Sequence, residues 1–414
     1  MAREMKDSGV EWIGEIPKDW ELVKNKYIFN IKKAKLPSKF FDDNTLIPYM
    51  SMDYIRNPEI IPLFAKDGDF CSKNDILLLW DGSNAGEIIF NHPEGYAPST
   101  TAILKLKKNI RQNFSQYYLK FFEKYLKKTV IGMGIPHVNG EILKNSIFLI
   151  PSLQEQEKIA NYLDKEVADI DLIIEKTKTT IEDYKKYKQS IITEAVTKGL
   201  NPNVEMKDSG IEWIGQIPKH WKKINPKALF YQRKDRAKKD DRQFTASQKY
   251  GIMYQDEFME KEGVRVTVVQ KDFDILKHVE PNDFVISMRS FQGGLEYSEL
   301  PGCISSAYVM LIPNLNKVYP KFFKFFFKSF KYINALQSTS NLVRDGQAMR
   351  YSNFSQLYLV EIPLEEQKEI AEYLDKKIAE IDNLIAKKES LISEMEEYKK
   401  SLIYECVTGK KEII

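Results

Sequence analysis

Two clusters of basic residues in this sequence could neutralise a polyanion. The first cluster consists of Lys32, Lys33, Lys35 and Lys39, and the second of Arg233, Lys234, Arg236, Lys238, Lys239 and Arg242. Such clusters contact nucleic-acid phosphates, but phosphate contacts alone do not read a base sequence. For any single lysine, a solvated surface run is the better interpretation.

A second pair of segments carries side chains of the types that bind base edges. Each segment follows a predicted buried strand, at 75–80 or 283–288, and the candidates are Ser83 and Asn84 in one copy and Arg289, Ser290 and Gln292 in the other. Arginine can bind guanine, and asparagine or glutamine can bind adenine, through two hydrogen bonds. A plain turn is an equally favoured interpretation.

A third pair of segments combines glycine with polar residues. The candidates are Gly134 and His137 in segment 132–137, and Asn341, Arg344 and Gln347 in segment 340–347. Glycine permits close approach of a backbone to a partner, so these segments could also reach base edges. A purely structural turn is again a serious alternative.

The sequence lacks recognisable catalytic motifs. It has no GxxxxGK[ST] phosphate loop, no methyltransferase Asp/Asn-Pro-Pro-aromatic motif, no GxSxG and no HExxH. Its three cysteines and four histidines are scattered, which predicts neither a zinc site nor a disulfide framework. Neighbouring carboxylates such as Asp169 and Asp171 fall in a charged run typical of a solvated helix face. We therefore expect no catalytic residue, cofactor or metal site in this chain.

An internal duplication must position these candidate segments. Residues 5–20 and 206–221, here called the opening motifs, read MKDSGVEWIGEIPKDW and MKDSGIEWIGQIPKHW and differ at only three of 16 positions. Residues 159–197 and 370–408 are identical at 19 of 39 positions. Between these blocks, 22–149 and 223–361 cannot be aligned. Repeated blocks that enclose two unrelated variable regions suggest one scaffold that carries two different recognition regions.

The second repeated block predicts two long helices. Apolar or near-apolar residues recur at steps of three and four along one face, from Ile159 to Tyr184 and from Ile370 to Met395. Gly199 and Gly409 follow, where left-handed caps are expected. Each helix would have about 45 residues and span roughly 65 Å. The obvious partner of each seam is the other copy, which favours an antiparallel pair with a pseudo-two-fold axis and the variable regions at opposite ends.

The remaining regions predict an α+β fold. Strands are expected at 75–80, 101–106, 283–288 and 307–312, and helices at about 114–128 and 320–337. We predict four segments: a recognition domain (1–150), a helix (151–200), a second recognition domain (201–362) and a second helix (363–414).

The chain is 43% hydrophobic with a net charge of +3, and it has no signal segment and no membrane-spanning run. We expect a soluble, cytoplasmic protein with no membrane partner.

The repeated motifs resemble those of the specificity subunits of type I restriction-modification systems. The resemblance rests on DSGVEWIGEIPKDW and DSGIEWIGQIPKHW, and on a proline followed by LQEQEKIANYLD or LEEQKEIAEYLD. It covers essentially the whole chain and the order of its parts. The variable regions match that family only in their strand pattern.

The resemblance implies a non-catalytic DNA-reading subunit. Each variable region would be a target recognition domain that reads one half of a split double-stranded DNA site. The helices would set the spacer and recruit two modification (methyltransferase) subunits, with 150–170 and 362–381 as the docking surfaces. S-adenosylmethionine would then belong to those subunits, and ATP and Mg²⁺ to motor-nuclease restriction subunits. Two alternatives are a coiled-coil scaffold for protein partners and a stand-alone DNA-modifying enzyme.

Overall fold

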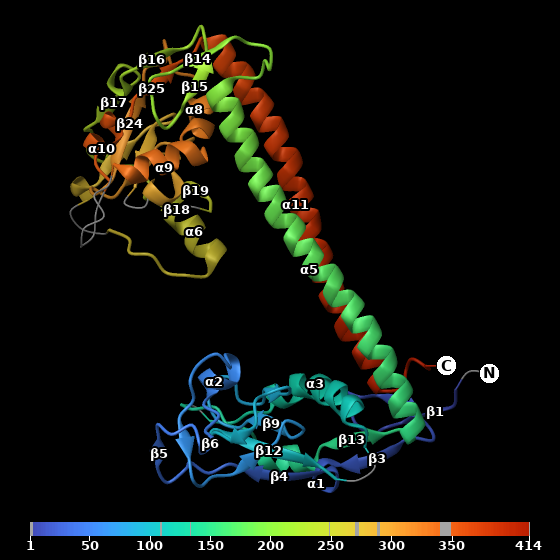
Figure 1. Ribbon diagram of the computed structural model, residues 1–414. Coiled ribbons are helices and arrows are strands. Elements are labelled where there is room, and N and C mark those ends of the chain that lie inside the picture. Colours follow the sequence, from blue (N-terminus) through green and yellow to red (C-terminus); the bar gives the residue numbers. More distant parts are fainter. Residues whose placement is uncertain are drawn as a thin grey trace. The chain divides into compact units, whose positions relative to one another are not determined.

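The computed structural model describes residues 3–107, 110–132, 134–247, 249–269, 273–287, 290–339 and 349–413, without the side chain of Phe291. It divides into two compact units (Figure 1). Unit 1 comprises Met1–Thr177 with Ser390–Ile414, and unit 2 comprises Lys178–Glu389. Each unit therefore combines one variable region with parts of both long helices, so the compact units cut across the four predicted segments.

The strands of unit 1 are short. They are β1 (Met5–Asp7), β2 (Glu15–Pro17), β3 (Glu21–Lys24), β4 (Phe29–Lys33), β5 (Phe40–Phe41), β6 (Ile47–Pro48), β7 (Phe64–Ala65), β8 (Phe70–Cys71), β9 (Ile76–Leu79), β10 (Ile88–Ile89), β11 (Gly95–Tyr96), β12 (Thr101–Leu106) and β13 (Ile147–Ile150). The helices of its variable region are α1 (Asn25–Ile28), α2 (Met52–Arg56), α3 (Gln112–Lys128) and α4 (Gly140–Asn145).

Unit 2 has a similar set of elements. Its strands are β14 (Met206–Asp208), β15 (Gln216–Pro218), β16 (Lys222–Ile224), β17 (Phe230–Arg233), β18 (Phe244–Ser247), β19 (Gly251–Tyr254), β20 (Lys277–Val279), β21 (Phe284–Ile286), β22 (Glu296–Tyr297), β23 (Gly302–Ile304), β24 (Val309–Pro313) and β25 (Leu359–Glu361). Its helices are α6 (Gln255–Glu262), α7 (Ser290–Gly293), α8 (Pro320–Phe326), α9 (Phe330–Ser338) and α10 (Tyr351–Gln356), with 3-10 turns at Pro226–Ala228 and Phe273–Ile275.

The two variable regions share the topology of their central sheet although their sequences do not align. The sheet order is β10-β9-β12-β4 in unit 1 and β17-β24-β21-β22 in unit 2, which is the same order read from the other edge. All neighbours are antiparallel. The pairs β1–β2, β3–β13 and β8–β11 recur as β14–β15, β16–β25 and β20–β23. The duplication therefore preserved the topology of the middles as well as the frame.

Each central sheet is buried on both faces. In unit 1, Ile76 and Leu78 of β9 contribute to the core that includes α3, whereas Leu77 between them belongs to a second core. Unit 2 repeats this alternation, with Phe284 in its larger core and Val285 in its smaller one. Side chains alternate between the faces of a strand, so a strand covered on both faces is apolar throughout. This confirms the predicted buried strands.

The prediction of one continuous helix at 320–337 was wrong. The segment expected as one helix at 320–337 forms α8 and α9, which are separated at Phe327–Ser329. Phe322, Phe323, Phe326 and Phe327 are all buried in the unit 2 core. The break is a turn closed by the amide of Lys328, which donates to Phe325 at 3.0 Å, and by the amide of Ser329, which donates to Phe326 at 3.1 Å.

The two long helices are α5 (Leu153–Lys198) and α11 (Leu364–Val407), of 46 and 44 residues. In unit 1, Ile159 and Leu163 of α5 share a core with Leu402 and Cys406 of α11. In unit 2, the other end of α5 shares a core with the beginning of α11, where Ile370 and Leu374 lie. The helices therefore pack antiparallel within each unit, side by side in Figure 1, which confirms the predicted seam and pairing.

The opening motifs attach the ends of these helices to each unit. The Trp20 indole donates a hydrogen bond to Glu155 of α5 at 3.0 Å, and Trp221 donates to Glu366 of α11 at 2.9 Å. Gly409 ends α11 in the left-handed region at φ +72°, where an added Cβ would lie 2.4 Å from Pro17. Each motif therefore holds the beginning of one long helix beside the end of the other.

Candidate nucleic-acid interface

The second and third candidate segments of unit 1 lie against each other. The amide of Gly82 donates to the carbonyl of Pro136 at 2.9 Å, and the amide of Val138 donates to Trp80 at 2.9 Å. An antiparallel bridge joins Asp81 to His137. The structure thus brings together two segments that are more than 50 residues apart in the chain, as a shared functional surface requires.

The tip of the second segment presents two polar side chains to solvent. The turn is closed by Ala85 N to Gly82 O at 2.9 Å and by Gly86 N to Leu79 O at 2.8 Å. Ser83 and Asn84 are both exposed at this tip. Within the described residues, neither side chain has a hydrogen-bond partner, so both are available to a ligand. Their contact with bases stays a prediction.

The first basic cluster borders this tip. Lys33 Nζ lies 2.9 Å from the carboxylate of Asp81 and 5.9 Å from the ring centre of Trp80. Lys32 pairs with Asp69 at 2.5 Å, whereas Lys39 lies 5.3 Å from the ring centre of Phe41. Lys32, Lys33, Lys35 and Lys39 are all exposed. Lys33 is therefore the member of the cluster that the structure places beside the tip.

The remaining candidates of unit 1 are in the third segment. Gly134 is exposed, and an added Cβ would meet no atom within 4 Å. The fold therefore does not require glycine at this position. His137 is partly buried, and its backbone pairs with Ile131 at 2.8 and 2.9 Å. Both residues stay predicted DNA contacts.

Arg233 of unit 2 is held by the fold. Its Nε and Nη2 donate to both carboxylate oxygens of Asp283 at 2.6 and 3.0 Å, and Nη1 donates to Asp235 at 2.8 Å. Burial raises the pKa of Asp283, and the hydrogen bonds from Arg233 oppose that rise. The Arg233 side chain is only 14% exposed. This bidentate pair favours a structural role, and a phosphate contact by Arg233 stays a prediction.

The other basic residues of the second cluster are exposed and differ in their partners. Arg236 donates to the carbonyl of Ile275 at 3.0 Å, and Lys238 pairs with Glu280 at 2.7 Å. Lys234 and Lys239 have no ion-pair or hydrogen-bond partner for their side chains in the described part of the chain. Lys234 and Lys239 are therefore the best-placed phosphate ligands of this cluster.

The second segment of unit 2 differs from the prediction. It forms the short helix α7 in place of a plain turn. Ser290 is only 1% exposed, and its hydroxyl accepts a hydrogen bond from the amide of Ser287 at 2.8 Å. We therefore withdraw Ser290 as a DNA contact, because a buried hydroxyl that closes its own turn cannot reach a base. Gln292 is exposed.

Four further candidates lie outside the described residues. They are Arg289, Asn341, Arg344 and Gln347.

The described part of the chain contains no group of three or more His, Cys, Asp or Glu side chains suited to a metal ion. No described helix is both long enough and apolar enough to cross a bilayer.

A buried glutamine in each copy is a structural element that the sequence did not reveal. Gln156 is fully buried. Its amide group donates to the carbonyl of Pro151 at 2.9 Å and accepts from the amide of Arg111, at the start of α3, at 2.8 Å. Gln367 repeats this arrangement, accepting from Tyr319 at the start of α8 at 2.8 Å. The repeated LQEQ and LEEQ sequences were the available signal, since each glutamine couples a long helix to its variable region.

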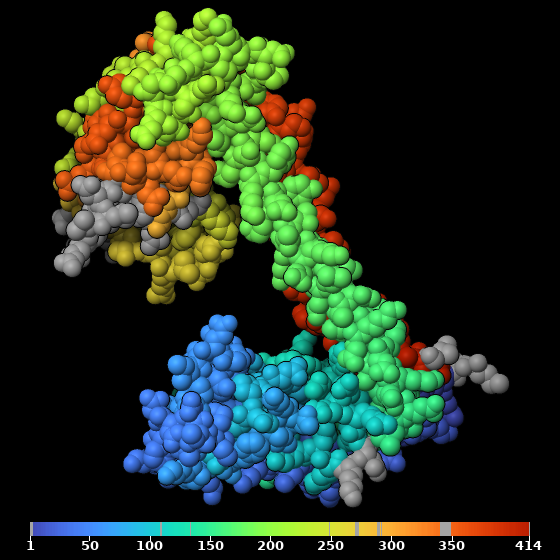
Figure 2. Space-filling view, in the orientation of Figure 1, coloured from blue at the N-terminus to red at the C-terminus, as the bar shows by residue number. Residues whose placement is uncertain are grey.

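Exposed apolar side chains repeat along the two long helices, and Figure 2 shows one face of α5 in green. The repeated blocks are offset by 211 residues, so Ile173 is equivalent to Leu384 and Tyr187 to Tyr398. These four side chains are 45%, 40%, 58% and 48% exposed, respectively. Each long helix therefore exposes a large aliphatic side chain and a tyrosine at positions matched by the repeat.

The comparisons with known proteins agree with this architecture. Residues 17–183 match the model of the type I restriction modification DNA specificity domain. The type I restriction enzyme MjaVIII specificity subunit of Methanocaldococcus jannaschii is 36% identical over 220 residues, which cover 52% of this chain and 50% of that protein. The putative MjaX specificity subunit of the same organism is 24% identical over 96% of this chain and 95% of its own.

Solved structures extend the likeness in fold to nearly the whole chain. A chain from a study of complex assembly and conformational transition in the type I R-M system has a TM-score of 0.71, at 14% identity, over 96% of this chain and 99% of its own. The HsdS subunit from Thermoanaerobacter tengcongensis has a TM-score of 0.51, at 14% identity, over 96% and 98%. Residues 17–183 are therefore similar to the type I restriction modification DNA specificity domain, and the chain as a whole has the fold of these solved structures.

Proposed function

We propose that this chain reads a bipartite double-stranded DNA target, with one half-site for each variable region. The observation that carries the proposal is the combination of one sheet topology with two unrelated sets of loops. A common scaffold with different exposed side chains is suited to reading two different sequences. In unit 1, Ser83 and Asn84 are the candidate base contacts, flanked by the lysine cluster that would contact phosphates.

The chain would contribute recognition and no catalysis. The relatives are named specificity subunits, and the sequence has neither a GxxxxGK[ST] phosphate loop nor a methyltransferase Asp/Asn-Pro-Pro-aromatic motif. We propose that two modification subunits dock on the long helices and supply S-adenosylmethionine. ATP and Mg²⁺ would be bound by restriction subunits. The repeated exposed residues Ile173 and Leu384 support two equivalent docking sites on the helices.

An exchange of one variable region tests the division into half-sites. Residues 22–149 are replaced by the corresponding region of a relative, and methylated positions are mapped in DNA exposed to the assembled complex. We expect exactly one half of the recognised sequence to change. A change in both halves, or in neither, would overturn the assignment of one region to one half-site.

We further propose that the helices set the spacer between the half-sites. Seven residues make about two helical turns, so inserting a heptad near Thr179 and another near Ser390 keeps the seams in phase. The insertion adds roughly 10 Å of helix, which corresponds to about three base pairs. We expect weaker binding and a longer preferred spacer. Methylation of the original spacer by a folded heptad variant would overturn this role.

A further inference from the structure

The segments that follow the two long helices make different contacts in the two units. In unit 1, the chain beyond Gly409 folds back over α5. Lys411 Nζ donates a hydrogen bond to the hydroxyl of Tyr162 at 2.8 Å and lies 5.0 Å from the centre of its ring. Ile413, two residues later, packs against the unit 1 core. A lysine and an aliphatic side chain of the same chain thus cover this position.

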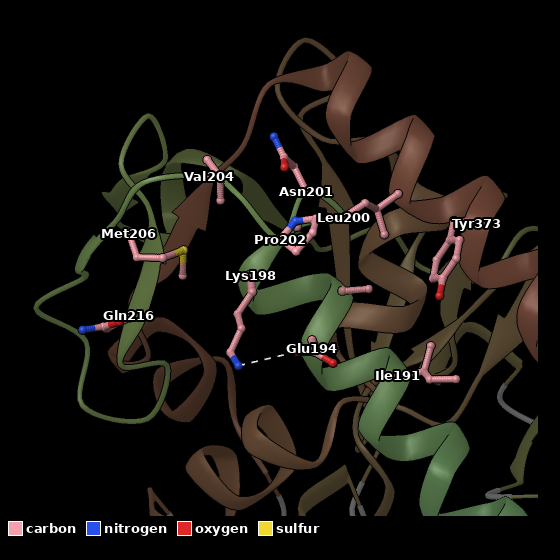
Figure 3. Close-up of a pocket in the computed structure, with 12 residues that line it drawn as sticks. Ile191, Glu194, Lys198, Leu200, Asn201, Pro202, Val204, Met206, Gln216 and Tyr373 are labelled. Atoms are coloured by element: carbon pink, nitrogen blue, oxygen red, sulfur yellow. Dashed lines mark ion pairs between the residues drawn. The ribbon is translucent and has the colours of Figure 1, made fainter.

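In unit 2 the equivalent position lacks a lysine, because Leu200 stands at the 211-residue offset from Lys411 and lines the cavity. Tyr373 corresponds to Tyr162 by the 211-residue offset, but it is 38% exposed. Its hydroxyl makes no hydrogen bond to any described residue. A cavity of about 560 Å³ lies beside it, between the end of α5 and the segment that leads into β14 (Figure 3). Figure 3 shows Tyr373, Glu194 and Lys198 around this cavity.

The cavity has the chemistry of a site for a long cationic side chain. The carboxylate of Glu194 lies 3.6 Å from Lys198, a long and exposed ion pair that is worth little. The end of α5 adds the partial negative charge of a helix C-terminus, which favours a cation. The apolar lining, from Ile191, Val204 and Met206, suits the methylene stem of a lysine.

We propose that this unit 2 cavity binds a lysine side chain of a partner protein, which takes the place that Lys411 occupies in unit 1. The incoming ammonium would donate to the Tyr373 hydroxyl, as Lys411 does to that of Tyr162, and Glu194 would be the nearby carboxylate of the cavity lining. The inference rests on the proposed function, because the partner it names is the modification subunit. It adds that the two docking ends are unequal, since unit 1 is closed by its own chain and unit 2 is completed by the partner.

Crosslinking tests the contact directly. The full chain is assembled with the modification subunit of its own system and treated with a zero-length carbodiimide, which joins a carboxylate to an amine. We expect a crosslink between Glu194 and a lysine of the modification subunit. Glu405 occupies the equivalent position in unit 1 and should give none. A crosslink pattern in which Glu194 joins only Lys198, or nothing, would contradict the proposal.

Binding measurements with matched variants provide a second readout. We expect Glu194→Gln and Tyr373→Phe each to weaken binding of one modification subunit about tenfold, the effect of losing one charge-assisted hydrogen bond. Glu405→Gln is the control and should leave both binding steps unchanged. Lys198→Met should strengthen the same step, because it removes the competing ammonium.

The outcomes distinguish a failure of the lysine site from a failure of the proposed function. If the modification subunit binds the wild-type chain, but the Glu194 and Lys198 variants bind like the Glu405 control, the lysine site is wrong and the proposed function stands. If the modification subunit does not bind the wild-type chain at all, both the proposed function and the site are overturned. Melting temperatures of the variants, expected to equal that of the wild type, exclude misfolding as the cause.

Discussion

Lys399 of α11 donates two hydrogen bonds of 2.7 Å to the carboxylate of Asp171 of α5. Lys188 and Asp382 repeat this pair in unit 2 at 2.7 and 2.8 Å. The 211-residue offset relates Asp171 to Asp382 and Lys188 to Lys399. The two pairs are therefore equivalent contacts of one antiparallel register, with the donor and acceptor helices exchanged.

The Lys399–Asp171 pair predicts a loss of stability that a second, compensating substitution restores. Lys399→Asp should place two carboxylates together and lower the free energy of unfolding of unit 1 by about 0.2–1 kcal/mol, since both side chains are partly exposed. Adding Asp171→Lys should restore most of the loss. Urea unfolding of the single and double variants measures both. Failure of the second substitution to rescue would contradict this register.

The buried glutamines predict a larger effect. Gln156→Leu leaves the carbonyl of Pro151 and the amide of Arg111 without their buried partner, at a cost of about 1–3 kcal/mol for each group. The control is Gln154→Leu, which alters an exposed residue of the same helical turn. Calorimetry should show a lower melting temperature for the first variant alone. Equal melting temperatures would show that the glutamine does not hold α5 to α3.

The second basic cluster predicts a change in salt dependence. Lys234→Ala together with Lys239→Ala should weaken binding to all DNA sequences and reduce the slope of log K against log salt by about 1.8, or about 0.9 for each phosphate contact. Titration of the assembled complex at several salt concentrations measures the slope. Lys185→Ala with Lys186→Ala, on the exposed face of α5, is the control. An unchanged slope would place the two cluster lysines away from DNA.

The exposed residues of the helices predict the number of bound partners. Leu384→Glu should remove one modification subunit, and Ile173→Glu the other, because a carboxylate would be desolvated in each contact. Native mass spectrometry counts the subunits bound to each variant. Leu315→Glu changes a side chain that is 61% exposed and lies off the helices, and it should leave the count unchanged. Two subunits on either helix variant would exclude that residue from the interface.

Glu280 predicts a dependence of stability on pH. Hydrogen bonds from His278 and Lys238 lower the pKa of Glu280 to about 2. Its folded pKa lies below the ordinary value of about 4.3, so its contribution is present above that value. The contribution is lost as the pH falls through about 2. Unfolding of Glu280→Gln and wild type from pH 6 to pH 2 should therefore show a difference that disappears across this window. A constant difference would contradict an ionised Glu280 at this site.

Periodicity and duplication predicted the scaffold well, because both can be read from the sequence alone. The seam from Ile159 to Ile181 and the caps at Gly199 and Gly409 appeared as expected. The buried strands β9 and β12 also matched, since their apolar runs are covered on both faces. A repeated frame reveals itself when the chain is compared with itself, without any knowledge of its contacts.

The side-chain roles in the candidate interface were harder to predict, because they depend on distant partners. Arg233 and Ser290 have residue types suited to DNA, but Asp283 sequesters the first and burial the second. Neither partner is evident from local spacing. The meeting of Gly82 with Pro136 likewise depends on the paths of two separate loops. Composition therefore suggested the kind of surface but could not distinguish its exposed members from its structural ones.

The division into units has a consequence for synthesis on the ribosome. Unit 2 is one continuous stretch, 178–389, and all of its core residues are available once that stretch has been made. Unit 1 joins its first 177 residues to 390–414, and its core contains Leu402, Cys406 and Val407. Contacts that span so much sequence form late. The half of the protein that is translated first is therefore the last to complete its core, and until then it presents apolar surface to chaperones.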